Sequence, residues 1–108
     1  MKLDGYRGQV VMITGAASGF GARLATELAG MGARLVPADR NAQGLERVAE
    51  ALHAAGTEVL ARRCDVTSEA DVESVVVAGV QRFGQLDVGI NNAGILMPMK
   101  SVRRSRRC

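Results

Sequence analysis

The sequence predicts an α/β fold built on a parallel sheet with helices on both faces. Apolar stretches of strand length alternate along the chain with stretches whose apolar residues recur every three or four positions. The connections are short, and asparagine, serine and glycine stand where the helices should begin and end. This alternation is typical of right-handed β-α-β crossovers, which produce a parallel sheet.

Four segments are predicted strands. Residues 9–13 are almost continuously apolar, as expected for a strand that is buried on both faces. The other three are residues 35–38, 58–62 and 86–90. Two positions weaken them, because Pro37 removes a hydrogen-bond donor from the second strand and Gly89 interrupts the fourth.

Three segments between the strands are predicted helices. The first spans residues 20–31, and Asn41 is a suitable N-cap for the second. Ser68 and Asp71 resemble a capping box for the third helix, which Gly84 ends. The resulting order β-α-β-α-β-α-β predicts a partial Rossmann-type, doubly wound sheet with strand order 3-2-1-4.

Residues 14–21 read TGAASGFG and directly follow the first predicted strand. Gly15 permits a tight turn, Gly19 lets a phosphate approach the backbone, and Gly21 lets the next helix pack close to the sheet. The N-terminus of that helix offers N–H groups and the positive end of its dipole, and Ser18 could add a hydroxyl donor. The turn therefore predicts a pyrophosphate site, although 13 glycines in the chain leave a chance match as the alternative.

Asp39 stands at the end of the second predicted strand, 18 positions beyond Gly21. A carboxylate there can accept hydrogen bonds from both hydroxyls of an adenosine ribose, and it would repel a 2′-phosphate. This favours NAD over NADP, while the neighbouring Arg40 could meet a 2′-phosphate. A polar loop that caps the next helix is the alternative reading of Asp39.

Composition limits the other function classes. The 108 residues suffice for one domain, and no stretch approaches the length of a membrane span or resembles a signal peptide. The two cysteines show no metal or redox spacing, and Cys64 is expected to be a small buried residue. No metal site is predicted, and the expected location is the cytoplasm.

The net charge of +3 arises from the end of the chain. Residues 100–108 read KSVRRSRRC and hold five of the 14 basic residues, which leaves nine basic and 11 acidic groups elsewhere, a net charge of −2. We expect residues 1–99 to form the domain and residues 100–108 a disordered, solvated tail. Basic residues can neutralise phosphates, but no aromatic residue accompanies them to stack on bases, so nucleic-acid binding is not expected.

The motifs together resemble the short-chain dehydrogenase/reductase (SDR) family over residues 5–99. They are TGAASGFG, Asp39, the Asp65–Val66 pair and NNAG at residues 91–94. In the predicted strand order, TGAASGFG and NNAG face each other across the switch point between the first and fourth strands. The resemblance implies hydride transfer between a nicotinamide cofactor and an alcohol or a ketone.

The resemblance also implies particular cofactor contacts. The residues that would surround the pyrophosphate are Gly15, Ser18, Gly19, Phe20 and Gly21. Those that would meet the adenosine are Asp39 and Arg40 at the ribose, Asp65 at the adenine amino group and Val66 against the ring. Those that would border the nicotinamide are Asn92, Ala93 and Gly94, while Asn91 would stabilise the sheet. Helix capping by Asp65, and turn formation alone by the asparagines, are the alternatives.

The catalytic residues of the family have no counterpart here. Family members use a Tyr-x-x-x-Lys pair, a serine and a further asparagine, all beyond the NNAG turn. The single tyrosine of this sequence is Tyr6, and no lysine follows it four places on, so no residue is assigned a catalytic role. Because positioned acid–base groups contribute roughly 10²–10⁴-fold to rate, we expect a truncated NAD-binding oxidoreductase fragment, from an interrupted reading frame or an early stop, without activity of its own.

A second hypothesis follows from the predicted topology. The fourth strand would be an exposed apolar edge, and such edges associate with other strands. The alternative function is therefore a non-enzymatic partner that pairs through this edge with an intact relative or with itself. No membrane partner is expected.

Overall fold

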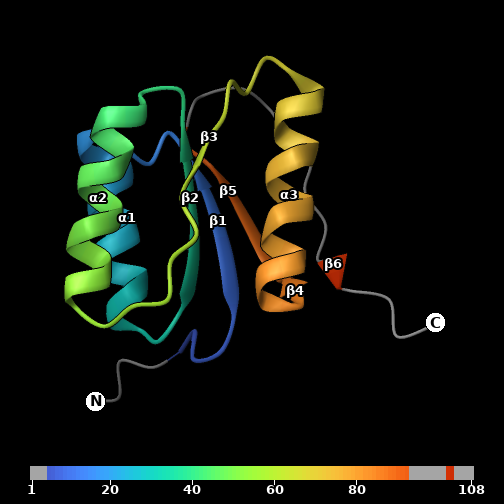
Figure 1. Cartoon of the computed structure of the whole chain (residues 1–108). Coiled ribbons are helices and arrows are strands. Elements are labelled where there is room, and N and C mark those ends of the chain that lie inside the picture. Colours follow the sequence, from blue (N-terminus) through green and yellow to red (C-terminus); the bar gives the residue numbers. More distant parts are fainter. Residues whose placement is uncertain (1–4, 93–101, 104–108) are drawn as a thin grey trace.

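The structure, a computed structural model, describes residues 5–92 and 102–103 and has a four-stranded parallel sheet at its centre. Helices α1 and α2 cover one face of this sheet and helix α3 covers the other (Figure 1). The helices are α1 (Gly19–Gly30), α2 (Ala42–Ala54) and α3 (Glu69–Phe83). The strands are β1 (Val10–Thr14), β2 (Arg34–Asp39), β3 (Arg62–Arg63), β4 (Gln85–Leu86), β5 (Val88–Asn91) and β6 (Val102–Arg103).

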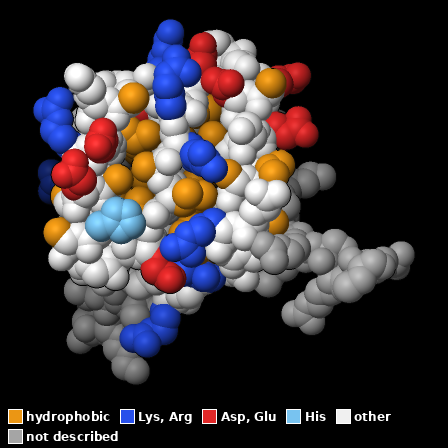
Figure 2. Space-filling view, viewed as in Figure 1, with side chains coloured by type: hydrophobic (Ala, Val, Ile, Leu, Met, Phe, Trp, Pro, Cys, Tyr) orange, Lys and Arg blue, Asp and Glu red, His pale blue; other side chains and the backbone are white. Residues whose placement is uncertain are grey.

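The sheet order is β3-β2-β1-β5. It confirms the predicted partial Rossmann-type architecture, with β5 in the place of the fourth predicted strand. The exposed edge strand β3 consists of Arg62 and Arg63. In the view of Figure 2, several basic side chains lie along the middle of the molecule, and acidic side chains are interspersed around them. Charged residues on an edge strand oppose pairing with another sheet.

Strand β1 is the most deeply buried element, with every residue at most 1% exposed. It pairs in parallel with β2 on one side and with β5 on the other. Because side chains alternate along a strand, Val11 and Ile13 join the core beneath α1 and α2, while Val10 and Met12 join the core beneath α3. These two helix layers explain the apolar run of the first predicted strand.

The predicted third strand, residues 58–62, is shorter than expected. Its pairing with β2 consists of a bridge between Leu35 and Val59 and of the two-residue strand β3. Pro37 lies between these pairings, and its nitrogen faces the same side as that of Leu35, whose N–H donates to Glu58. Because proline has no N–H to donate, the ladder is interrupted there.

The predicted fourth strand, residues 86–90, is divided into β4 and β5 around Asp87. The Asp87 N–H donates to the Val10 carbonyl at 2.9 Å, and the Val10 N–H donates to the Asp87 carboxylate at 2.9 Å. Strand β5 continues as the fourth parallel strand, while β4 pairs antiparallel with β6. Strand β6 lies inside the segment predicted to be disordered, and residues 100, 101 and 104–108 of that segment lie outside the described residues.

The predicted N-caps form, with one difference. The Asn41 side chain accepts the Gly44 N–H at 3.1 Å, and the Ser68 hydroxyl accepts the Asp71 N–H at 3.2 Å. The Asp71 carboxylate does not close a capping box on Ser68, because the Ser68 N–H donates to the Asp65 carbonyl. It accepts the Asp65 N–H instead, at 3.0 Å. Asp71 therefore fixes the backbone at Asp65.

Candidate functional site

The glycine-rich turn joins the end of β1 to the start of α1. Gly15 has a φ of 68°, in the left-handed region that favours glycine. Ser18 is the N-cap of α1, and its hydroxyl accepts the Gly21 N–H at 3.1 Å. A Cβ at Gly19 would meet nothing within 4 Å, so the space beside this residue is open. Phe20 is 71% exposed next to the turn.

Gly21 is required for the close approach of α1 to the turn. A Cβ built on it would overlap the Gly15 carbonyl and lie 2.7 Å from Asn92 Nδ2. This supports the packing role that the sequence predicts for Gly21. The glycine at position 21 has a second role that its spacing does not reveal. Because Gly21 has no side chain, the Asn92 amide has room beside it.

The two asparagines after β5 reach β1 and its turn. Asn91 Oδ1 accepts the hydroxyl of the buried Thr14 at 2.9 Å, which joins the two strands where they end. Asn92 Nδ2 donates to the Gly15 carbonyl at 3.2 Å and to Ser18 Oγ at 3.0 Å. The structure thus brings the two predicted motifs into contact at the switch point, while residues 93 and 94 lie outside the described residues.

Asp39 also holds the glycine-rich turn. One carboxylate oxygen accepts the Ala17 N–H at 2.9 Å, and the other accepts the Asn41 N–H at 2.8 Å. The carboxylate at the end of β2 is therefore fixed between the turn and the start of α2. The two sequence-based interpretations of Asp39, ribose contact and a polar loop that caps the next helix, are both compatible with this geometry, because a carboxylate has about four lone-pair sites.

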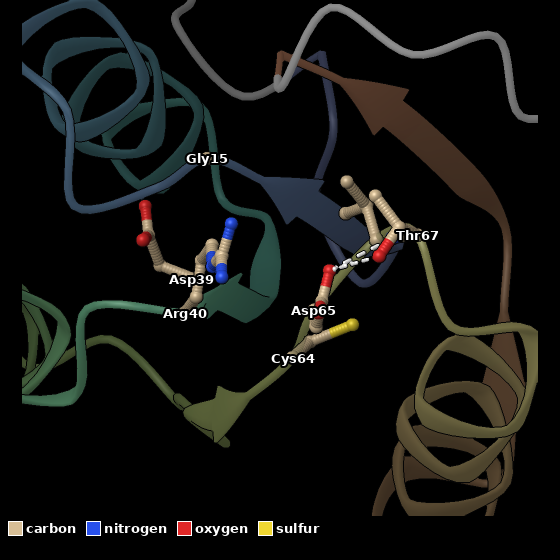
Figure 3. Close-up of a pocket in the computed structure, with 7 residues that line it drawn as sticks. Gly15, Asp39, Arg40, Cys64, Asp65 and Thr67 are labelled. Atoms are coloured by element: carbon tan, nitrogen blue, oxygen red, sulfur yellow. Dashed lines mark hydrogen bonds between the residues drawn. The ribbon is translucent and has the colours of Figure 1, made fainter.

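A pocket of about 280 Å³ opens between the ends of β1, β2 and β3. Its lining residues are Gly15, Asp39, Arg40, Cys64, Asp65, Val66 and Thr67. Figure 3 shows the Arg40 side chain between the carboxylates of Asp39 and Asp65 in this view. Four predicted adenosine contacts, Asp39, Arg40, Asp65 and Val66, thus line one cavity.

Asp65 is oriented by a local turn. Its Oδ1 accepts both the N–H of Thr67, at 3.0 Å, and the hydroxyl of Thr67, at 2.7 Å. Among the described residues, Asp65 Oδ2 accepts no hydrogen bond, which leaves this oxygen available to a ligand. The hydrogen bonds from Thr67, first the hydroxyl and then the backbone, lower the pKa of Asp65, and Arg40 and Arg63 add to this.

Two residues of the pocket were not predicted as site residues. Thr67 could have been found from the Asp-x-Thr spacing, which favours an Asx turn. Cys64 is 1% exposed, as the sequence predicts for it, but its place at the pocket has no sequence signal. Burial, with smaller contributions from Asp71 and Asp65, raises the pKa of the Cys64 thiol above its ordinary value. The thiol is therefore neutral at physiological pH and acts as a packing group.

The sequence matches the family model described as short chain dehydrogenase over residues 9–106. The chain belongs to the short-chain dehydrogenase family. This is an SDR oxidoreductase family with an NAD(P)-binding Rossmann-type fold, and the match extends into the basic segment at the end of the chain.

Individual relatives agree with this family. L-fucose dehydrogenase of Oryctolagus cuniculus is 38% identical over 100 residues, which are 93% of this chain and 34% of that protein. An SDR from Burkholderia phymatum, solved in complex with NAD, is 39% identical with a TM-score of 0.76 over 78% of this chain and 30% of that one. An NAD⁺-bound xylitol dehydrogenase is 35% identical with a TM-score of 0.80, over 84% and 35%. The SDR chain thus spans about a third of the length of these relatives.

The described part of the SDR chain contains no group of three or more His, Cys, Asp or Glu residues placed to hold a metal ion. No helix in the same part is long and apolar enough to cross a membrane.

The turn at Asp65 predicts a pH effect. We expect Thr67→Ala to raise the pKa of Asp65 toward its ordinary value of 3.8, because the hydroxyl bond to the carboxylate is lost. A lowered folded-state pKa stabilises the fold above the unfolded-state pKa, and this contribution disappears as the pH falls through the folded-state pKa. The difference in stability between the two proteins should therefore be present at neutral pH and vanish in acid.

NMR titration of the Asp65 carboxyl carbon and urea unfolding at several pH values measure both effects. Thr26→Ala is a matched control, because the exposed Thr26 hydroxyl donates to the Ala22 carbonyl, away from the pocket. An Asp65 pKa that is the same in Thr67→Ala and in the control would show that the Thr67 hydroxyl does not lower the pKa of Asp65.

Proposed function

We propose that this chain binds NAD at the glycine-rich turn and the adjoining pocket, as the cofactor-binding segment of an oxidoreductase that acts on an alcohol or a ketone. The observation that carries the proposal is the open turn between β1 and α1. The space beside Gly19 is open, and the first turn of α1 contains no acidic residue. A helix N-terminus of this kind suits a pyrophosphate, because its N–H groups and dipole favour an anion.

The residues around the turn fit the two ends of the cofactor. The pocket beside Asp39 would hold the adenosine, with Asp65 Oδ2 accepting from the adenine amino group and Val66 against the ring. The nicotinamide, which supplies the hydride acceptor or donor when bound, would lie on the side of Asn92. In this proposal, the residues of the glycine-rich turn and of the pocket bind and orient the cofactor.

We propose NAD rather than NADP as the preferred cofactor. The Asp39 carboxylate is held at the mouth of the pocket by the Ala17 and Asn41 N–H groups, so it cannot turn away from a 2′-phosphate without breaking these bonds. Repulsion between two anions disfavours that phosphate. The exposed Arg40 is the residue that would offset the repulsion.

We propose that this polypeptide by itself binds the cofactor without turnover. Tyr6 is its single tyrosine, and the Tyr6 N–H donates to the Met31 carbonyl at the edge of the sheet opposite to the glycine-rich turn.

An alcohol or a ketone as the substrate class is supported by relatives named L-fucose dehydrogenase and xylitol dehydrogenase. We place the protein in the cytoplasm, because its cysteine usage shows no disulfide spacing.

A second candidate function is pairing with an intact relative or with another copy of this chain. Within the described residues, β5 forms one edge of the main sheet, and its four residues are only half-buried. A half-buried parallel edge strand is a template for a further strand. Co-expression with a full-length relative tests this candidate, and the absence of a stable mixed complex would exclude it.

Two glycines of α1 allow a matched test of the turn. We expect Gly19→Ala to weaken NADH binding about tenfold or more, since its Cβ would occupy the space that a phosphate needs, and a tenfold loss corresponds to about 1.4 kcal/mol. The fold should be retained, because that Cβ meets no protein atom within 4 Å. Titration followed by NADH fluorescence measures the affinity.

Gly30→Ala is the control, because Gly30 also lies in α1 and its Cβ would also meet nothing within 4 Å. This variant should bind NADH like the unmodified chain. Equal affinity of both variants would contradict the position of the pyrophosphate, and the absence of a saturable signal with the unmodified chain would contradict binding itself.

Cofactor preference tests the role of Asp39. We expect Asp39→Asn to weaken NADH binding roughly tenfold, the effect of losing a hydrogen bond to a charged group. NADPH binding should suffer less, because the neutral amide no longer repels the 2′-phosphate. Since any loosening of the turn affects both cofactors, the ratio of their affinities is the informative quantity. Glu46→Gln on the exposed side of α2 is the charge-matched control. An unchanged ratio of NADH to NADPH affinity in Asp39→Asn would refute the role of Asp39 in cofactor preference.

A further inference from the structure

The Ser18 hydroxyl has no unused hydrogen-bonding capacity within the turn. It donates to the Gly15 carbonyl at 2.7 Å, and it accepts from the Gly21 N–H at 3.1 Å and from Asn92 Nδ2 at 3.0 Å. A hydroxyl has one hydrogen and two lone pairs, so all three are engaged. Ser18 can therefore donate to a phosphate only if its hydrogen leaves the Gly15 carbonyl.

The Gly15 carbonyl has two further donors that do not depend on this hydrogen, and one of them is the Ser18 N–H, at 3.2 Å. Asn92 Nδ2 is the other donor, 3.2 Å from the Gly15 oxygen and 3.0 Å from Ser18 Oγ, so this amide group is shared between the two oxygens. A carbonyl oxygen has two lone pairs, so the Ser18 N–H and the Asn92 amide match both when the hydroxyl turns away. Without Asn92, one lone pair of the half-buried Gly15 carbonyl would lose its donor, which would cost free energy.

Gly21 and Asn92 fit each other sterically. The Asn92 amide occupies the position beside Gly21 in which even a methyl group would come within 2.7 Å of Nδ2. Asn92 also lies directly after β5, whose residue Asn91 is bonded to Thr14 of β1. The amide is therefore held against the turn both by its own bonds and by the sheet.

We propose that Asn92 is a positioning residue that holds the glycine-rich turn and allows the Ser18 hydroxyl to exchange the Gly15 carbonyl for a phosphate oxygen of the cofactor. In the exchange, Ser18 Oγ keeps the bonds it accepts from Gly21 and Asn92, and the Gly15 carbonyl keeps its bonds from Asn92 and from the Ser18 N–H. The number of hydrogen bonds within the turn falls by one, and the new bond to the phosphate replaces it. The inference rests on the proposed function for the identity of the ligand.

A double-mutant cycle on the 108-residue chain tests the exchange. We expect Asn92→Ala to weaken NADH binding about three- to tenfold, the effect of one hydrogen bond. In a Ser18→Ala background, where no hydroxyl needs to be released, the same change should weaken binding less than about twofold. Equal effects in the two backgrounds would overturn the proposal. Asn92→Asp, which is isosteric but has no donor when ionised, should act in the same direction as Asn92→Ala.

Amide hydrogen exchange without cofactor separates this inference from the proposed function. Asn92→Ala should speed exchange of the Ser18 and Gly21 amides, which close the turn, and leave α2 unchanged. Unchanged exchange at these two amides would overturn the inference even if NADH binds. Failure of the unmodified chain to bind NADH contradicts the proposed function, and the exchange rates then decide whether Asn92 holds the turn.

Asn91→Ala is the matched control for both measurements. Asn91 precedes Asn92, and its Oδ1 accepts the hydroxyl of Thr14, the last residue of β1. We expect this variant to lower the melting temperature while its effect on NADH binding is the same with and without the Ser18 hydroxyl. Coupling between Asn91 and Ser18 as large as that of Asn92 would show that the effect comes from the strand and would contradict a specific role of the Asn92 amide.

Discussion

Burial of β1 on both faces and both edges is the constraint on which the rest of the structure depends. All five of its residues are at most 1% exposed, and it pairs with β2 and β5 at once. Because all these strands are parallel, their carboxyl ends meet at one edge of the sheet. The glycine-rich turn, Asp39 and the two asparagines after β5 are therefore neighbours through the position of β1 rather than through any local signal.

At this edge, polar groups hold the protein together and also face the candidate ligand. Asp39 joins the turn to the start of α2, and Asp65 is fixed by Thr67 and Asp71. Ser18 is the N-cap of α1, and its hydroxyl also donates to the Gly15 carbonyl within the turn. Such pre-organisation lowers the cost of ordering the site when a cofactor binds. It also means that a substitution at the edge changes stability and affinity together, so control variants are needed to separate the two.

The parts of the fold that the sequence predicts are those with local causes. Apolar periodicity and the cap at Asn41 define the helices, and the strand order follows from crossover handedness. The sequence indicates that Pro37 weakens the second strand, but it does not show where the hydrogen-bond ladder is interrupted. That position depends on how the third strand aligns with β2. For the site, glycine spacing and Asp39 are local signals. The contact of Asn92 with Ser18 joins residues 74 positions apart. The Asp71 carboxylate accepts the Asp65 N–H instead of the expected Ser68 N–H. Only the folded structure reveals these two contacts.

Amide NMR of the chain during titration with NAD⁺ tests most directly whether this edge is the cofactor site. We expect saturable shifts at Gly15, Ser18 and Asp65, and none at the opposite edge of the sheet, for example at Gly32 and Gly84. Saturable shifts confined to that opposite edge, or an unchanged spectrum at millimolar NAD⁺, would contradict the proposed cofactor site.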